Sequence, residues 1–154
     1  MDNLFVNFLG TLKSIQIWFH SAHVLSKGPG FAGDHVHIYG EIYTQAGERY
    51  DQAVEKFVAL TNNESFACPI QSTELAAKAL RSYPTPVDQS DLMIATIAHQ
   101  MVRNFILQLE KLNADLEKQG AMTLGLSDYL SSLANEYENY FYYLQQRVKV
   151  VTED

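Results

Sequence analysis

The sequence predicts an all-α protein, a four-helix bundle with a short extra helix between the second and third long helices. Apolar residues recur at three- and four-residue spacing through four long stretches, which is typical of helices with one buried face. Glycine, proline and asparagine groups separate these stretches. No stretch alternates apolar and polar residues as a strand does. A chain of 154 residues is of ordinary single-domain size, so we expect one domain over residues 1–154.

The first long helix is predicted over residues 4–26, where it meets the helix-breaking sequence Lys27-Gly28-Pro29-Gly30. The second is predicted over residues 31–60, and its expected apolar side comprises Val36, Tyr39, Tyr43, Ala46, Tyr50, Ala53 and Phe57. Its other side carries Gly40 and Gly47, although glycine costs about 1 kcal/mol relative to alanine inside a helix. Close approach of another helix, including one from a second subunit, explains these glycines; tolerated drift on a solvated face is the alternative.

The remaining helices have recognisable ends. The short helix is predicted over residues 71–83, with Ser72 or Thr73 as its N-cap. The third long helix is predicted over residues 88–118, with Gly120 at the position of a C-cap. The fourth is expected to begin near Ser127, acting as an N-cap.

Composition excludes several classes of protein. Eleven Lys and Arg against 18 Asp and Glu give a formal net charge of −7, and no basic cluster offsets it, so DNA binding is not expected. The single cysteine, Cys68, cannot form an internal disulfide, which fits a reducing compartment. The N-terminus lacks signal-peptide features, and the apolar runs are too short to span a membrane. We therefore expect a cytoplasmic protein.

Residues 19–57 contain four of the five histidines. His23 precedes the glycine-proline break and His35 follows it, so two antiparallel helices joined there bring the imidazoles together. Asp51 and Glu55 lie one helical turn apart and repel each other unless a cation lies between them. Imidazoles with carboxylates suit a divalent transition metal, with iron and zinc as the leading candidates. The alternatives are polar residues near a turn and an ordinary solvated helix face.

This stretch resembles the Dps family, the DNA-protection-during-starvation branch of the ferritin superfamily. A histidine four residues before Lys-Gly-Pro, here His23, and one six residues after the proline, here His35, carry the resemblance. So does the segment Tyr-Thr-x-x-Gly-Glu-x-x-Asp-x-x-x-Glu, here residues 43–55. The short helix and the acidic, aromatic-rich last helix, with Leu133-Ala134-Asn135-Glu136-Tyr137-Glu138, are also similar.

The resemblance implies a hollow homododecamer that oxidises ferrous iron, often with hydrogen peroxide, and stores the ferric product against oxidative damage. It implies a site at the two-fold interface, where His23 and His35 of one subunit face Asp51 and Glu55 of its neighbour. The lysine-rich N-terminal tail that binds DNA in some members is absent. On this basis the predicted activity is that of a ferroxidase, an oxidoreductase acting on metal ions.

The chain departs from the family pattern in three ways. The usual acidic ligand four residues after the second histidine is replaced by Tyr39 or Gly40. The spacing from that histidine to Asp51 is one residue longer than usual, which a helix absorbs only with a bulge or a rotated start. A tryptophan that usually follows the first histidine is replaced by Val24. His37 and Glu41, at i and i+4, are a substitute ligand pair.

Other residues have two interpretations each. His20 shares a helix face with His23 and is an auxiliary ligand or a surface residue, whereas His99 is predicted to be a satisfied core histidine. Glu48 assists the metal or pairs with an arginine. Asp128 lines an ion-entry pore or caps its helix. The tyrosines of the last helix relay electrons or, as aromatic residues at helical spacing usually do, form core.

Three functions remain open. The first is the iron-oxidising, iron-storing oligomer. The second is a non-enzymatic shell or metal-binding protein with a degraded oxidase centre, which the missing acidic ligand favours. The third is a di-metal bundle with its site inside one subunit, for which the nearest motif is Asp34-x-x-His37.

Overall fold

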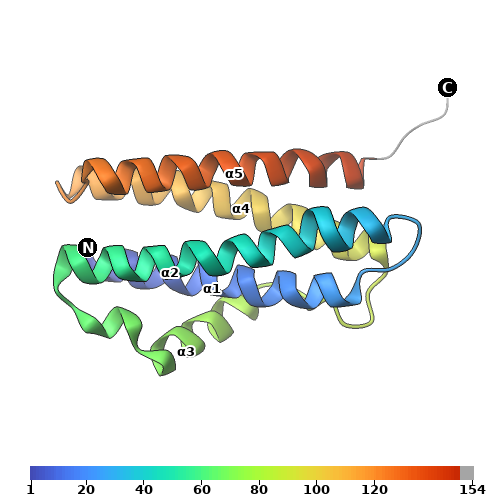
Figure 1. The fold of residues 1–154 in the computed structure, drawn as a ribbon, viewed down its shortest axis with the longest axis horizontal. Coiled ribbons are helices and arrows are strands. Elements are labelled where there is room, and N and C mark those ends of the chain that lie inside the picture. The colour runs from blue at the N-terminus through green and yellow to red at the C-terminus, as the bar shows by residue number, and fades with distance from the viewer. Residues whose placement is uncertain (150–154) are drawn as a thin grey trace.

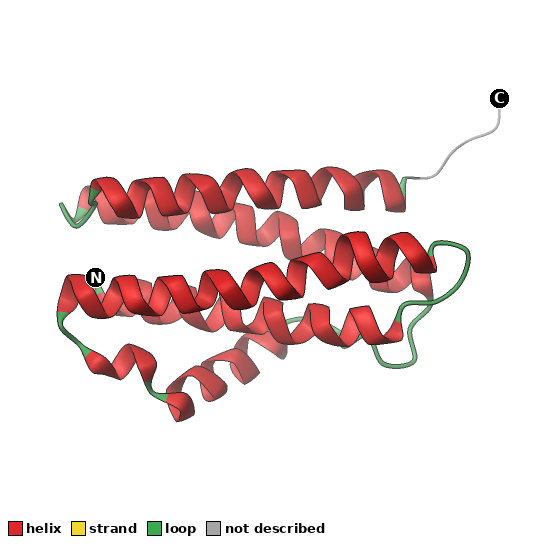
Figure 2. Cartoon of the chain, viewed as in Figure 1, coloured by secondary structure: helices red, strands yellow, loops and turns green. Residues whose placement is uncertain are grey.

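A computed structural model describes residues 1–149, and every regular element in that range is a helix (Figure 2). The elements in chain order are α1 (Asp2–Leu25), η1 (Gly33–Gly40), α2 (Glu41–Thr61), η2 (Glu64–Ala67), α3 (Pro69–Leu80), α4 (Asp91–Lys118) and α5 (Leu124–Val148). The all-α class and a short helix between the second and third long helical segments are thereby confirmed. The predicted domain of residues 1–154 extends into residues 150–154, which lie outside the described part.

Four long helical segments lie side by side: α1, the continuous segment η1–α2, α4 and α5 (Figure 1). α1 packs against α2 and α3, and α4 packs against α5. The chain returns from the end of α2 to the start of α4 through η2, α3 and an irregular segment. One hydrophobic core joins all these helices, and its fully buried aromatic side chains include Phe5, Phe19, Phe57, Phe105 and Tyr137.

Two predicted N-caps are wrong. α3 begins at Pro69, because proline has the backbone geometry of a first helical residue and needs no hydrogen-bond acceptor there. Ser72 and Thr73 lie inside its first turns, and both hydroxyls donate to the Pro69 carbonyl. α5 begins at Leu124, three residues before Ser127, because the Thr123 hydroxyl accepts the Leu126 amide at 3.1 Å.

The other long helices end close to their predicted positions. α4 begins at Asp91 rather than at residue 88, and the Ser90 hydroxyl accepts the Met93 amide. At its C-terminus Gly120 has a left-handed φ of 66°, as a C-terminal glycine should.

The second long helical segment is not uniform. Its first eight residues, η1, form a π-helix. Backbone hydrogen bonds in a π-helix join residues five apart, one more than in an α-helix. Such a π-helical stretch is a bulge, one of the two irregularities expected in this segment. It also changes which side chains face the core: Ile38 and Tyr39 are buried, while Val36, predicted to be apolar-side, is 56% exposed. The α-helical register expected across residues 31–60 was therefore wrong in its first part.

Both glycines on the opposite side of this segment allow close packing. A Cβ on Gly40 would lie 2.5 Å from the His35 carbonyl oxygen and 3.0 Å from Nδ1 of His23. A Cβ on Gly47 would lie 2.8 Å from the amide nitrogen of Gln16. The His35 carbonyl belongs to η1 itself, but His23 and Gln16 lie on α1, so close approach by another helix is confirmed without a second subunit.

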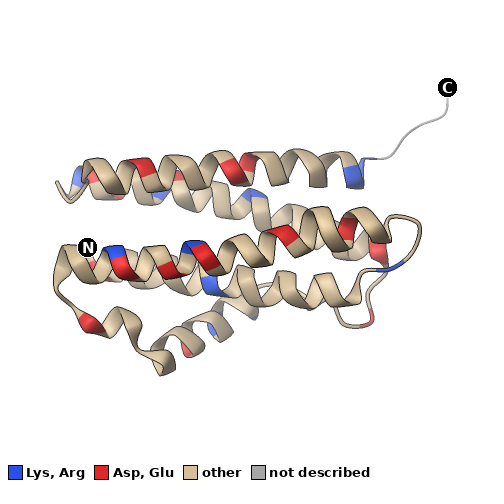
Figure 3. Ribbon diagram, in the orientation of Figure 1, with Lys and Arg blue, Asp and Glu red and all other residues tan. Residues whose placement is uncertain are grey.

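Charge is spread over the helices (Figure 3). Lys and Arg positions are scattered along several elements and alternate with acidic ones. Within residues 1–149, no helix is both long enough and apolar enough to cross a membrane.

Candidate metal centre

His23 and His35 connect the two helices at the hairpin. Their rings stack with centroids 3.7 Å apart and planes 14° from parallel. Nδ1 of His23 lies 2.6 Å from the His35 carbonyl oxygen, and Nδ1 of His35 lies 2.7 Å from the His23 carbonyl oxygen. The prediction that the hairpin brings these two imidazoles together is confirmed.

The reciprocal bonds determine the tautomer of both rings. A carbonyl oxygen only accepts, so each Nδ1 must carry its hydrogen and donate it. In a neutral imidazole the lone pair is then on Nε2, for which the described residues supply no hydrogen-bond partner. A ring that donates one nitrogen to a backbone carbonyl and presents the other is the usual arrangement of a metal-ligating histidine.

Aromatic side chains surround the pair. Phe31 stacks on the outer face of His35 at 4.9 Å, and Tyr43 lies 5.1 Å from His23. His20 is exposed and packs against Tyr43 at 4.8 Å, so it lies beside the pair rather than in it. These contacts restrict the rings to one orientation.

His37 and Glu41 are on a different surface. Both are exposed, and they line an open groove between η1–α2 and α5 together with Glu48, Glu136 and Tyr140. Glu136 is engaged by Arg49 and Gln45, so the arginine partner considered for Glu48 belongs to Glu136 instead. The structure therefore does not bring His37 to the stacked histidines.

Asp51 and Glu55 are exposed on α2. Asp51 follows His35 by sixteen residues on one continuous helical segment, which separates them by roughly 24 Å at about 1.5 Å per residue. One chain cannot place both on one ion. Consistent with this, no three His, Cys, Asp or Glu side chains within residues 1–149 lie close enough together to hold a metal ion.

The position of the missing acidic ligand supplies no substitute. Tyr39 is 1% exposed and its hydroxyl is buried without a partner in the described residues, which raises its pKa well above the ordinary tyrosine value. Gly40 has no side chain and lies under His23. The intra-subunit di-metal hypothesis also loses its motif, because Asp34 is 2% exposed and paired with Arg147.

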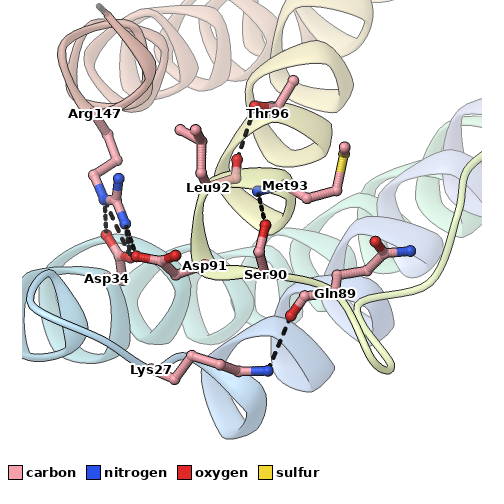
Figure 4. Close-up of polar contacts among 9 residues, drawn as sticks. All are labelled: Lys27, Asp34, Gln89, Ser90, Asp91, Leu92, Met93, Thr96 and Arg147. Atoms are coloured by element: carbon pink, nitrogen blue, oxygen red, sulfur yellow. Dashed lines mark hydrogen bonds and ion pairs between the residues drawn. The ribbon is translucent and has the colours of Figure 1, made fainter.

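Arg147 is the important residue that sequence reasoning missed. Its Nε and Nη2 donate to Asp34 at 3.0 and 3.1 Å, and Nη2 also donates to Asp91 at 3.0 Å (Figure 4). The hydrogen bond to Asp34 raises the pKa of the guanidinium, although burial opposes this. A charged Asp34 in the first turn of the helical segment was the only signal, and its partner is 113 residues away.

The remaining candidates are mostly structural. His99 is half-buried and stacks on Phe141 at 4.8 Å, and burial lowers its pKa. Its Nε2 has no partner in the described residues, so it is a core histidine but not a satisfied one. Tyr129, Tyr137 and Tyr140 are buried as predicted for core residues, whereas Asp128 is exposed beside Glu55, Arg49 and Lys56 in one shallow hollow.

Comparison of the chain with protein-family models, curated proteins and solved structures gave no match. The interpretation of the site therefore depends on the side chains themselves.

Proposed function

We propose that this chain is the subunit of a ferritin-like, Dps-like oligomer that takes ferrous iron as substrate at a seam between two copies. The observation that carries the proposal is the stacked His23–His35 pair. Its reciprocal hydrogen bonds leave two Nε2 lone pairs available at the tip of the hairpin. Asp51 and Glu55 of a second copy supply the carboxylates, since one chain cannot bring the four groups together. A closed assembly in which such seams repeat, such as the dodecamer the resemblance implies, provides a cavity for ferric iron.

The donor set suits this chemistry. Carboxylate oxygens are hard ligands that favour the higher charge of ferric iron, whereas imidazoles fix the geometry of the ferrous ion. Hydrogen peroxide accepts two electrons, one from each of two ferrous ions, and its O–O bond breaks to give two hydroxides. The ferric ions hydrolyse to the oxyhydroxide with release of protons. Other divalent ions such as zinc fit the same ligands but donate no electron.

The oxidase activity is tested by anaerobic stopped-flow mixing of ferrous-loaded protein with peroxide. We expect the ferric absorbance to grow faster with the native protein than in buffer, and Asp51→Ala to slow it at least about tenfold, the usual cost of losing a metal-ligand contact. Glu110→Ala is the matched control, because Glu110 is an exposed carboxylate on α4. A native rate equal to that of buffer would remove the oxidase.

Sharing between subunits is tested by complementation. A His23→Ala/His35→Ala chain and an Asp51→Ala/Glu55→Ala chain are each expected to be inactive alone. Because a two-fold seam carries two equivalent sites, their random co-assembly restores about a quarter of the native activity. No recovery in a co-purified assembly would overturn the sharing of ligands between subunits, and a monomer in size-exclusion chromatography would remove the seam altogether.

The second candidate is a non-enzymatic ferritin-like shell or metal-binding protein. The observation that favours it is the buried Tyr39 and the bare Gly40 at the position of the usual acidic ligand. A shell of this kind binds ferrous iron at the seam but oxidises it no faster than buffer. Equilibrium binding of Co(II), followed by its ligand-field absorption, separates this candidate from loss of the site, because Co(II) reports ligands without oxidation.

A further inference from the structure

We propose that Arg147 is a positioning residue: by holding Asp34, it keeps η1 in its π-helical register and so keeps His35 stacked on His23. This proposal takes the use of the histidine pair from the proposed function, but the geometry it explains is that of the chain itself. Figure 4 shows Arg147 between Asp34 and Asp91.

Asp34 is a buried charged residue. It is the second residue of η1, directly before His35, and its side chain is 3% exposed. A buried carboxylate requires a partner of opposite charge with well-aligned hydrogen bonds. Arg147 supplies three such contacts, at 3.0, 3.1 and 3.3 Å.

Several segments of the chain meet at the Arg147 guanidinium. Arg147 comes from the last turn of α5, and its Nη2 also bonds to Asp91 at the start of α4. A Cβ on Gly30 would lie 3.0 Å from its Nε, so the hairpin turn passes directly beside it. The start of η1 is therefore held against three other parts of the chain at once.

The π-helical register of η1 connects the ion pair with the histidines. A π-helical stretch is rare and competes with the ordinary α-helix. Moving one residue along an α-helix rotates a side chain by roughly 100°. Because α2 is held by its core packing, relaxation of η1 to α-helical turns would rotate Asp34 away from Arg147 and His35 away from His23 together. The buried ion pair selects the register, and the register sets the position of His35.

The test reads the histidine tautomers by nitrogen-15 NMR of the metal-free full chain. In the native protein we expect both His23 and His35 in the Nδ1–H form. In Arg147→Met we expect both signatures to change to the Nε2–H form that predominates in free histidine. Arg49→Met is the matched control, since it breaks an arginine–carboxylate pair between α2 and α5 that does not touch η1. Arg147→Lys keeps the charge but not the fork, and is expected to recover the native signature only in part.

The outcomes separate the two proposals. Native tautomers in a folded Arg147→Met chain would overturn the positioning role, as would an equal change in Arg49→Met. Circular dichroism confirms that each variant is helical; if Arg147→Met does not fold, Asp34→Asn gives the same comparison while preserving side-chain shape. Because no metal is present, failure of iron oxidation in the native protein would remove the proposed function and leave this inference standing.

Discussion

η1 and α2 are consecutive parts of one helical segment, but they are held in different ways. α2 is a regular α-helix whose Ile42, Ala46, Ala53 and Phe57 are buried against the core. η1 has a wider turn and depends on polar contacts near its N-terminal end: Asp34 to Arg147, and the reciprocal bonds of His23 and His35. Apolar packing tolerates small shifts, whereas these directional contacts do not. Of the candidate metal ligands on this segment, His35 lies on η1, whereas the carboxylates of Asp51 and Glu55 lie on α2.

The largest expected effect is on α2. Phe57 is fully buried and stacks on Phe5 with centroids 4.0 Å apart, so Phe57→Ala should cost about 3–5 kcal/mol of unfolding free energy. Urea denaturation measures this loss. The histidine tautomers should be native in the folded fraction, because Phe57 touches neither ring; a changed tautomer would mean that the two regions are not separate.

Gly40→Ala tests the other region, η1. Because its Cβ would lie 2.5 Å from the His35 carbonyl oxygen and 3.0 Å from Nδ1 of His23, we expect a loss of about 1–3 kcal/mol and of the histidine stack. Gly33→Ala is the control, since nothing lies within 4 Å of a Cβ there. It should be neutral or stabilising by up to about 1 kcal/mol. Equal thermal shifts in the two variants would contradict the close approach.

pH limits the range in which the two regions can be compared. Tyr137 on α5 is fully buried, which raises its pKa well above the ordinary value, and its hydroxyl has no partner in the described residues. The folded state thus holds this proton more tightly than the unfolded chain. Its contribution is complete below the ordinary tyrosine pKa of about 10 and is lost as pH rises above that value.

Tyr137→Phe should therefore flatten the loss of stability between about pH 10 and pH 12. Near neutrality it should stabilise by about 1 kcal/mol, because an unsatisfied buried hydroxyl is removed. Denaturant midpoints measured across the pH series check both expectations. An unchanged alkaline slope would mean that Tyr137 ionises as freely in the fold as in the unfolded chain.

The smallest effect distinguishes the two registers directly. Val36 is 56% exposed in the π-helix, although the α-helical periodicity of the sequence predicted it on the apolar side of the segment. Val36→Ser should change the unfolding free energy by no more than about 0.5 kcal/mol, as surface substitutions usually do. A loss above about 1.5 kcal/mol would indicate burial of this side chain and an α-helical register.

Particular residues divide what was predictable from what was not. The all-α class, the hairpin at Gly28-Pro29 and the meeting of His23 with His35 followed from local patterns, because helical spacing and helix breakers act over a few residues. The predicted irregularity before Asp51 was a bulge or a rotated helix start, and only the structure shows that it is a π-helical stretch over residues 33–40. The helix starts at Pro69 and Leu124 were missed because serine and threonine cap candidates occur at several neighbouring positions.

The sequence by itself determined which chemistry is available: two imidazoles at a hairpin and two carboxylates one turn apart, in a helical chain. Tertiary structure decided how the imidazoles are oriented, because their tautomers depend on carbonyl groups twelve residues away and the register of η1 on an arginine 113 residues after Asp34. Local periodicity contains no information about such contacts. The ion pair forms only when the last helix packs against the first hairpin, where a buried charge must have a partner.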